Sequence, residues 1–172
     1  MSETPVLKLA DLPKVQGFAL SEAERHEIEH ALGHYPDGRA ASIDALKAVQ
    51  KHRGWVPDEA IPEIAKAIGI SAADLEGVAT FYSLIFRKPV GRHVIKVCDS
   101  ISCHLTGYDE LRDELVKQLG VQYGQTTPDN RYTLLPICCL GACDRGATMM
   151  IDDELYGPVE PADVRGILEK FQ

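Results

Sequence analysis

Apolar residues recur every three or four positions through the first half of the chain, the spacing of helices with one buried face. Ser21 followed by Glu24 is a capping box, which predicts a first helix from Ser21 to about Gly33. Three further helices are expected over 41–52, between 58 and 69, and from 71 to 82. Four short helices with tight loops predict a small bundle.

The second half changes to alternating, β-branched stretches, which are typical of strands. Strands are expected at 93–97 and 132–137, followed by a hairpin of 148–151 and 155–156. One helix over 107–119, capped by Thr106, separates the first two strands, and a last helix runs from Pro161 to Phe171. This order predicts a small α/β sandwich with a mixed sheet.

A break in the periodicity at 87–92 separates these two halves. We therefore expect a helical domain at 21–88 and an α/β domain at 89–172, so that the fold class is α+β. Residues 1–20 contain several prolines and show no clear period, and we expect them to form a tail on the surface or on a partner.

The composition narrows the function classes. With 45% hydrophobic and 26% charged residues, the 172-residue chain is typical of a globular protein. No apolar stretch is long enough for a membrane span, and a net charge of −8 argues against nucleic acid as a main partner. The first 13 residues do not resemble an export signal, so the five cysteines are expected in a reducing compartment, as ligands and not as disulfides.

Four cysteines form two pairs. Cys98 and Cys103 enclose four residues, and Cys139 and Cys143 enclose three. Each pair follows an expected strand, so two neighbouring strands could bring both loops to one edge of the sheet. A [2Fe–2S] cluster takes four thiolates, two on each iron, and the spacing therefore predicts these four cysteines as its ligands.

Other uses of the cysteines remain open. A structural zinc site also takes four thiolates, although its pairs usually enclose two residues. The Cys-x-x-Cys of a thioredoxin-type disulfide is absent, and cysteines can also be small buried apolar residues. Cys138 could replace Cys139 as the ligand, but adjacent residues of an extended chain point to opposite faces. Gly141 allows a tight loop between Cys139 and Cys143, which favours that pair and would leave Cys138 in the core.

Several histidines are candidate metal ligands. His26, His30 and His34 recur at the four-residue spacing that chelates metals on helices. The apolar face runs through Ile28, so we expect these histidines to face solvent. His104 follows a possible ligand, but a Rieske-type role is disfavoured because four suitable cysteines are available.

Aromatic residues are few in this chain. Trp55, Phe81 and Tyr82 could anchor either the bundle or a partner, because aromatic side chains are enriched in both settings. We expect them in the core of the bundle.

The segments around the cysteines, 97–104 and 139–146, resemble the signature of the E subunit (NuoE) of bacterial NADH:quinone oxidoreductase, respiratory complex I. The stretches at 53–57, 77–82, 87–91 and 149–152 are also similar to that family, so the resemblance covers about residues 20–171. It implies a helical bundle followed by a thioredoxin-like domain that holds one [2Fe–2S] cluster. The ligands it implies are Cys98, Cys103, Cys139 and Cys143.

The resemblance also implies an electron-transfer protein with no catalytic residues of its own. FMN and NADH would bind a partner, the F subunit, with the iron–sulfur G subunit nearby in the peripheral arm, on the cytoplasmic side of the bacterial inner membrane. Consistent with this, no Gly-x-Gly-x-x-Gly follows the strand at 93–97. The same domain occurs in NAD-linked hydrogenases and formate dehydrogenases, which are the alternative assemblies.

Overall fold

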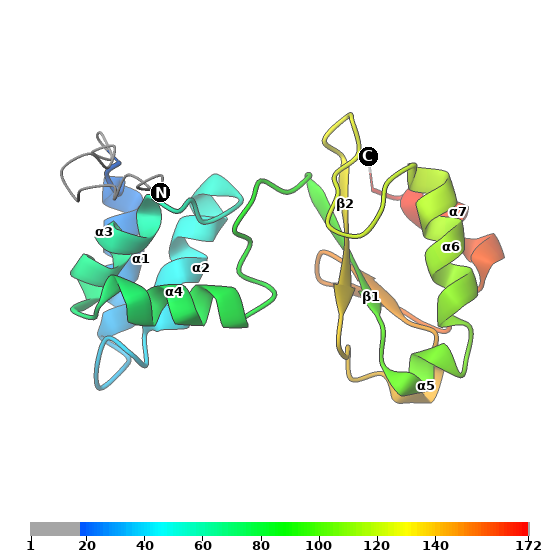
Figure 1. Ribbon diagram of the computed structural model, residues 1–172, viewed down its shortest axis with the longest axis horizontal. Helices are drawn as coiled ribbons and strands as arrows, with labels where there is room; N and C mark the ends of the chain where they lie inside the picture. The colour runs from blue at the N-terminus through cyan, green and yellow to red at the C-terminus, as the bar shows by residue number, and fades with distance from the viewer. Residues whose placement is uncertain (1–17, 172) are drawn as a thin grey trace, which may run out of the picture. The chain divides into compact units, whose positions relative to one another are not determined.

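The computed structural model describes residues 18–171, and its chain divides into two compact units, one ending at Lys88 and the other beginning at Pro89. The first unit is helical, and the second is a sheet with helices, as Figure 1 shows in blue to green and in green to red. The predicted α+β fold class is confirmed.

The helical unit buries one face of each of its helices. Its core contains the fully buried side chains of Ile28, Leu46, Ile64 and Leu75, one from each helix. Because all four helices contribute side chains to one shared core, the predicted bundle is confirmed. The helices are α1 (Glu22–Leu32), α2 (Ser42–Arg53), α3 (Ala60–Ile68) and α4 (Ala72–Phe81).

A buried carboxylate joins two of these helices. The capping box is present, with the Ser21 N–H donating to the Glu24 carboxylate at 2.7 Å and the Glu24 N–H donating to Ser21 Oγ at 3.2 Å. The same carboxylate accepts from Arg53 Nη2 at 2.8 Å. The Arg53 guanidinium, aided by Ser21 and opposed by burial, lowers the pKa of Glu24 from 4.5 to about 2. The pair ties the start of α1 to the end of α2.

The aromatic residues of this unit correct one expectation. Phe81 is 80% exposed and Tyr82 is 43% exposed, so their expected place in the core was wrong. Leu75 and Ala79 form the buried side of α4, and Phe81 follows Ala79 by about 200° around the helix axis. Trp55 is partly buried. The expected exposure of His26, His30 and His34 is confirmed.

The second unit is built on a four-stranded sheet in the order β2-β1-β3-β4. Strand β1 runs parallel to β2 and antiparallel to β3, and β3 and β4 form the predicted hairpin. Helices α6 and α7 pack on one face, where their apolar side chains meet those of β1 and β2 (Figure 1). The elements are β1 (His93–Cys98), α6 (Tyr108–Leu119), β2 (Tyr132–Ile137), β3 (Met149–Ile151), β4 (Glu154–Tyr156) and α7 (Val164–Leu168).

Three local features differ from the expectations. A short helix, α5 (Ile101–His104), was not predicted, because four residues are too few to show a helical period. The last helix is shorter than expected and begins as a 3₁₀ turn at Pro161–Asp163. Thr106 does not cap α6: its hydroxyl donates to the Ser102 carbonyl oxygen at 2.9 Å, and Gly107 is the cap residue.

Candidate metal centre

The parallel pairing of β1 and β2 brings the two cysteine segments to one edge of the sheet. Cys98, the last residue of β1, lies opposite Ile137, the last residue of β2. The N–H of Asp99 donates to the Ile137 carbonyl oxygen at 3.0 Å, which continues the pairing past the strand end. Since parallel strands end at the same edge, the segments 98–104 and 138–146 both begin there, beside α5 (Figure 1).

The first pair of cysteines is buried and held by β3. Cys98 is 2% exposed and Cys103 is 1% exposed, so the protein encloses both thiols. The Cys98 N–H donates to the Thr148 carbonyl oxygen at 3.1 Å. The Thr148 hydroxyl lies 3.5 Å from Cys103 Sγ.

The surroundings of these two thiols differ. Burial raises the pKa of Cys98, but the backbone N–H groups of Ser100 and Leu140, together with Cys103 and Thr148, outweigh it and leave the pKa below its usual value. Burial raises the pKa of Cys103, and Thr148 offsets that only in part. The Cys98 sulfur therefore lies in surroundings that favour a thiolate, which is the form that binds a metal.

The second pair of cysteines is exposed. Cys139 and Cys143 both lie at the surface, in the segment after β2. Gly141 has φ +76°, a left-handed conformation that glycine adopts without strain, and its N–H donates to Cys139 Sγ at 3.3 Å. Cys143 begins a 3₁₀ turn, Cys143–Arg145. The turn at Gly141 therefore directs a backbone N–H at the Cys139 sulfur.

The second segment packs against the first. The Leu140 N–H is directed at the Cys98 sulfur. A Cβ added to Gly146 would lie 2.4 Å from Thr106 Oγ1 and 3.6 Å from Cys103 Sγ, so this position admits only glycine without a shift. Within residues 18–171, however, no three Cys, His, Asp or Glu side chains gather into a metal-binding group. Cys98 and Cys103 are buried, while Cys139 and Cys143 lie exposed in the neighbouring segment.

Cys138 is exposed, so its expected place in the core was wrong. β2 ends at Ile137, and the alternation of side chains along a strand no longer applies to the residue that follows. The choice of ligand between Cys138 and Cys139 stays a prediction. The hydrogen bond from Gly141 to the Cys139 sulfur favours Cys139.

The donors at this edge suit an iron–sulfur cluster. Iron–sulfur clusters are held by thiolates, and their potentials depend on hydrogen bonds to the sulfurs and on burial. Backbone N–H groups lie near the sulfurs of Cys98 and Cys139, one pair of thiols is buried, and Gly146 lets the second segment approach Cys103 closely. Sequence reasoning missed the contributions of Thr148 and Leu140, because a backbone N–H and a buried threonine have no recognisable sequence spacing.

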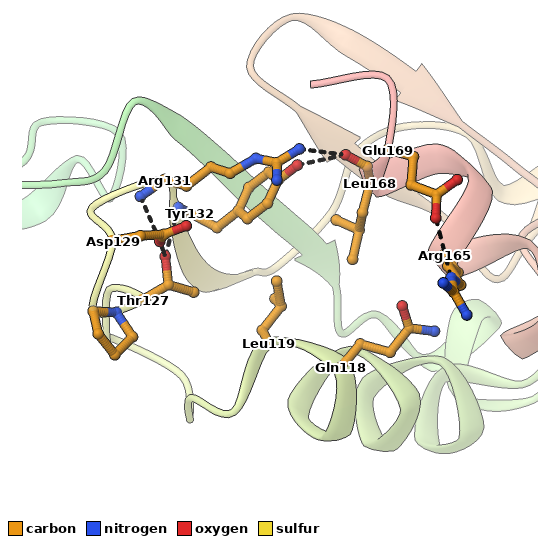
Figure 2. Close-up of a pocket in the computed structure, with 10 residues that line it drawn as sticks. Gln118, Leu119, Thr127, Asp129, Arg131, Tyr132, Arg165, Leu168 and Glu169 are labelled. Carbon is orange, nitrogen blue, oxygen red and sulfur yellow. Dashed lines mark hydrogen bonds and ion pairs between the residues drawn. The ribbon is translucent and has the colours of Figure 1, made fainter. Parts of the chain in front are cut away.

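A cavity of about 400 Å³ lies away from the cysteines, at the start of β2 (Figure 2). Figure 2 shows Arg131 and Tyr132 directed at the Leu168 carbonyl oxygen, to which they donate at 3.2 and 2.6 Å. Arg165 pairs with Glu169 across 3.0 Å. These contacts hold the C-terminal helix against the sheet, and no cysteine lines the cavity.

A mixed four-stranded sheet, helices on one face and paired cysteines at the ends of two parallel strands together define a thioredoxin-like iron–sulfur protein. The comparisons with known proteins agree. The thioredoxin-like [2Fe–2S] ferredoxin family matches residues 28–172. The chain is 57% identical to the E subunit of NADH-quinone oxidoreductase from Pseudomonas aeruginosa, over 94% of this chain and 98% of the relative. It is 56% identical to the corresponding protein of Escherichia coli K12, over 93% and 96%.

The chain therefore belongs to the thioredoxin-like [2Fe–2S] ferredoxin family and, within it, to the E-subunit group of NADH-quinone oxidoreductase. Among solved structures, an NAD⁺-reducing [NiFe]-hydrogenase matches with a TM-score of 0.62 and 25% identity. That match covers 74% of this chain and 22% of the hydrogenase chain.

The family membership settles the cofactor. The predicted cofactor, one [2Fe–2S] cluster, is confirmed, and the structural zinc site is ruled out as its alternative. The expectation that this chain is part of NADH-quinone oxidoreductase is confirmed as well. In the part of the chain that the structure describes, no helix is both long and apolar enough to cross a membrane.

Proposed function

We propose that Cys98, Cys103, Cys139 and Cys143 bind the [2Fe–2S] cluster of this electron-transfer protein. The meeting of the two cysteine segments at the shared end of β1 and β2 carries this proposal. Two thiolates from each segment would supply the four ligands, two for each iron. Bound there, the cluster takes up and releases single electrons.

The roles of the residues around the cluster follow from their contacts. Thr148 and the backbone N–H groups of Ser100 and Leu140 would stabilise negative charge on the sulfurs of the buried pair. Gly141 would do the same for Cys139. These polar groups favour the more negatively charged, reduced cluster and so raise its potential relative to a site without them.

The partners follow from the chemistry that this chain lacks. NADH gives up two electrons as a hydride, and the cluster accepts one, so a flavin is needed between them. We propose that the F subunit supplies the FMN and the NADH site, with the G subunit alongside in the peripheral arm on the cytoplasmic side of the membrane. The absence of a Gly-x-Gly-x-x-Gly after β1 supports a nucleotide site on another chain.

An NAD-linked hydrogenase is the less well supported alternative to NADH-quinone oxidoreductase. The likeness to the hydrogenase structure supports it, since the shared fold extends over 74% of this chain. Identity of 57% over nearly the full length of a NADH-quinone oxidoreductase protein, against 25%, favours NADH-quinone oxidoreductase.

Anaerobic purification of the chain from its source, with its partners, tests both parts of the proposal. We expect two iron and two acid-labile sulfide per chain, and co-purification with flavin-bearing and quinone-linked proteins. Iron without sulfide would contradict the proposed site. Recovery with hydrogenase or formate-oxidising proteins would overturn the assembly.

A further inference from the structure

Two large apolar side chains stand in solvent beside the buried cysteine pair. Ile101 is 72% exposed and Leu105 is 81% exposed, and neither belongs to the core of the sheet unit. Cys103 lies midway between them in the sequence and is 1% exposed. Burial of apolar side chains of this size is favourable, so their exposure leaves a stabilisation unused by this chain.

The geometry of α5 explains this division. Residues four apart lie on the same side of a helical turn, and a residue two positions on lies about 200° away. Ile101 and Leu105 therefore share the outer side of α5, while Cys103 points inward to Cys98 and Thr148. The apolar pair and the exposed Cys139 and Cys143 belong to segments that leave the same edge of the sheet.

The charge of this surface says what kind of partner fits it. Residues 101–106 contain no Asp, Glu, Lys or Arg, and His104 is their one titratable side chain besides the cysteine. The neighbouring α6 is strongly charged, with Asp109, Glu110 and Asp113 in its first two turns. Charged surfaces steer short-lived encounters, whereas an uncharged apolar surface suits a long-lived contact that salt does not weaken.

We propose that Ile101 and Leu105 anchor the redox partner that exchanges electrons with the cluster, through an apolar, uncharged patch on that partner. The inference rests on the proposed function, because an electron carrier must present its cluster edge to its redox partner. The anchors lie on the loop that carries a cluster ligand, so docking on them also excludes water from that edge. This chain and its redox partner therefore form a lasting contact and not a transient encounter.

The test compares the cluster-loaded full chain with a variant carrying Ile101→Ser and Leu105→Ser. A matched control is Leu155→Ser, which removes a 40% exposed leucine from the middle of β4, a strand separated from β1 by β3. Binding to the purified flavin-bearing, NADH-oxidising partner is titrated at low and high salt. Cluster absorption, and cluster reduction by dithionite and by NADH through that partner, are recorded for each chain.

We expect the double variant to keep its cluster and its reduction by dithionite, but to lose affinity by about 100-fold or more, since each anchor contributes about tenfold or more. Reduction by NADH should slow in parallel at fixed protein concentrations. The control should bind as the parent does, and the parent's affinity should change little with salt.

Equal binding by the parent and the double variant, both with intact clusters, would overturn the docking surface and leave the proposed function standing. If the affinity of the parent chain for that partner falls steeply with salt, the docking surface is not apolar as proposed. If the parent itself neither binds that partner nor takes electrons through it, the proposed function fails and the inference falls with it.

A second copy of this chain is the other occupant that the test can reveal. If the parent chain forms a dimer that the double variant does not form, and partner binding is unchanged, the patch binds a second copy instead. If the double variant loads no cluster, the single variants Ile101→Ser and Leu105→Ser replace it, each with about a tenfold loss expected.

Discussion

The two cysteine segments meet at one edge of the sheet but differ in how the protein holds them. Cys98 and Cys103 are buried, and both contact Thr148, the residue before β3: its carbonyl oxygen accepts from the Cys98 N–H, and its hydroxyl lies 3.5 Å from Cys103 Sγ. Cys139 and Cys143 are exposed, and the polar contact of the pair is the Gly141 N–H to the Cys139 sulfur. One half of the proposed site is therefore built into the core, and the other half lies on the surface.

The difference has a physical origin in the packing. The first segment runs from a central strand into α5 and back to the core, so its sulfurs are enclosed by β1, β3 and α6. The second segment leaves an outer strand, and its Cys139 and Cys143 lie at the surface. We infer that the buried pair is organised by folding, whereas the exposed pair gains its final geometry from the bound cluster.

Replacing the ligand of the exposed pair should have the largest effect. Cys139→Ala should prevent a stable cluster, because one iron loses a thiolate, and Cys138→Ala should leave the visible and EPR spectra of the cluster intact. Iron and sulfide analysis of the two purified variants checks this. The reverse pattern would move the ligand to Cys138.

Filling the space between the two segments should cost about 2 kcal/mol of folding stability. In Gly146→Ala, the new methyl group would meet Thr106 Oγ1 at 2.4 Å, beside Cys103. Denaturant unfolding of the cluster-free chain measures the loss. The double variant with Thr106→Ala should recover most of it, since the hydroxyl in conflict is gone. A loss unchanged in the double variant would show that the two segments do not pack as described.

In the cluster-free chain, the buried and exposed cysteine pairs should differ in the reactivity of their thiols. In the cluster-free, reduced chain, Cys138, Cys139 and Cys143 should react with iodoacetamide at least about tenfold faster than Cys98 and Cys103, because only exposed thiols are accessible. Mass spectrometry of timed samples gives the rates. With the cluster bound, Cys138 alone should react quickly. Equal rates for all five thiols would contradict a preorganised buried pair.

The smallest expected effect is on the potential of the cluster. Thr148→Val removes the hydroxyl that lies 3.5 Å from Cys103 Sγ and keeps the side-chain shape. Loss of one hydrogen bond, worth about 1 kcal/mol, should lower the one-electron potential by about 40 mV. A redox titration followed by EPR measures it. A potential that stays the same, with the cluster intact, would remove Thr148 from the groups that tune the site.

Much of the fold could be predicted because its signals are local. The capping box at Ser21, the buried positions of α2 and α3, and the β-branched residues of β1 and β2 each lie within a few residues of sequence. The cluster was predictable for a different reason. Two close cysteine pairs after two strands are rare enough to indicate a cluster, and the surrounding motifs indicated the family. The helix α5 was missed because it is shorter than the period that would reveal it.

The sequence alone determined most of the elements, the cysteine spacing and the family. Only the tertiary structure decided that Cys98 lies opposite Ile137, that Cys138 is exposed, and that Phe81 points to solvent. It also joined Glu24 to Arg53, and Thr148 to Cys103, across 29 and 45 residues of sequence. Burial and long-range contacts depend on which distant segments pack together. A pattern that is read along the chain contains the period of a helix or strand, but not the identity of its neighbours.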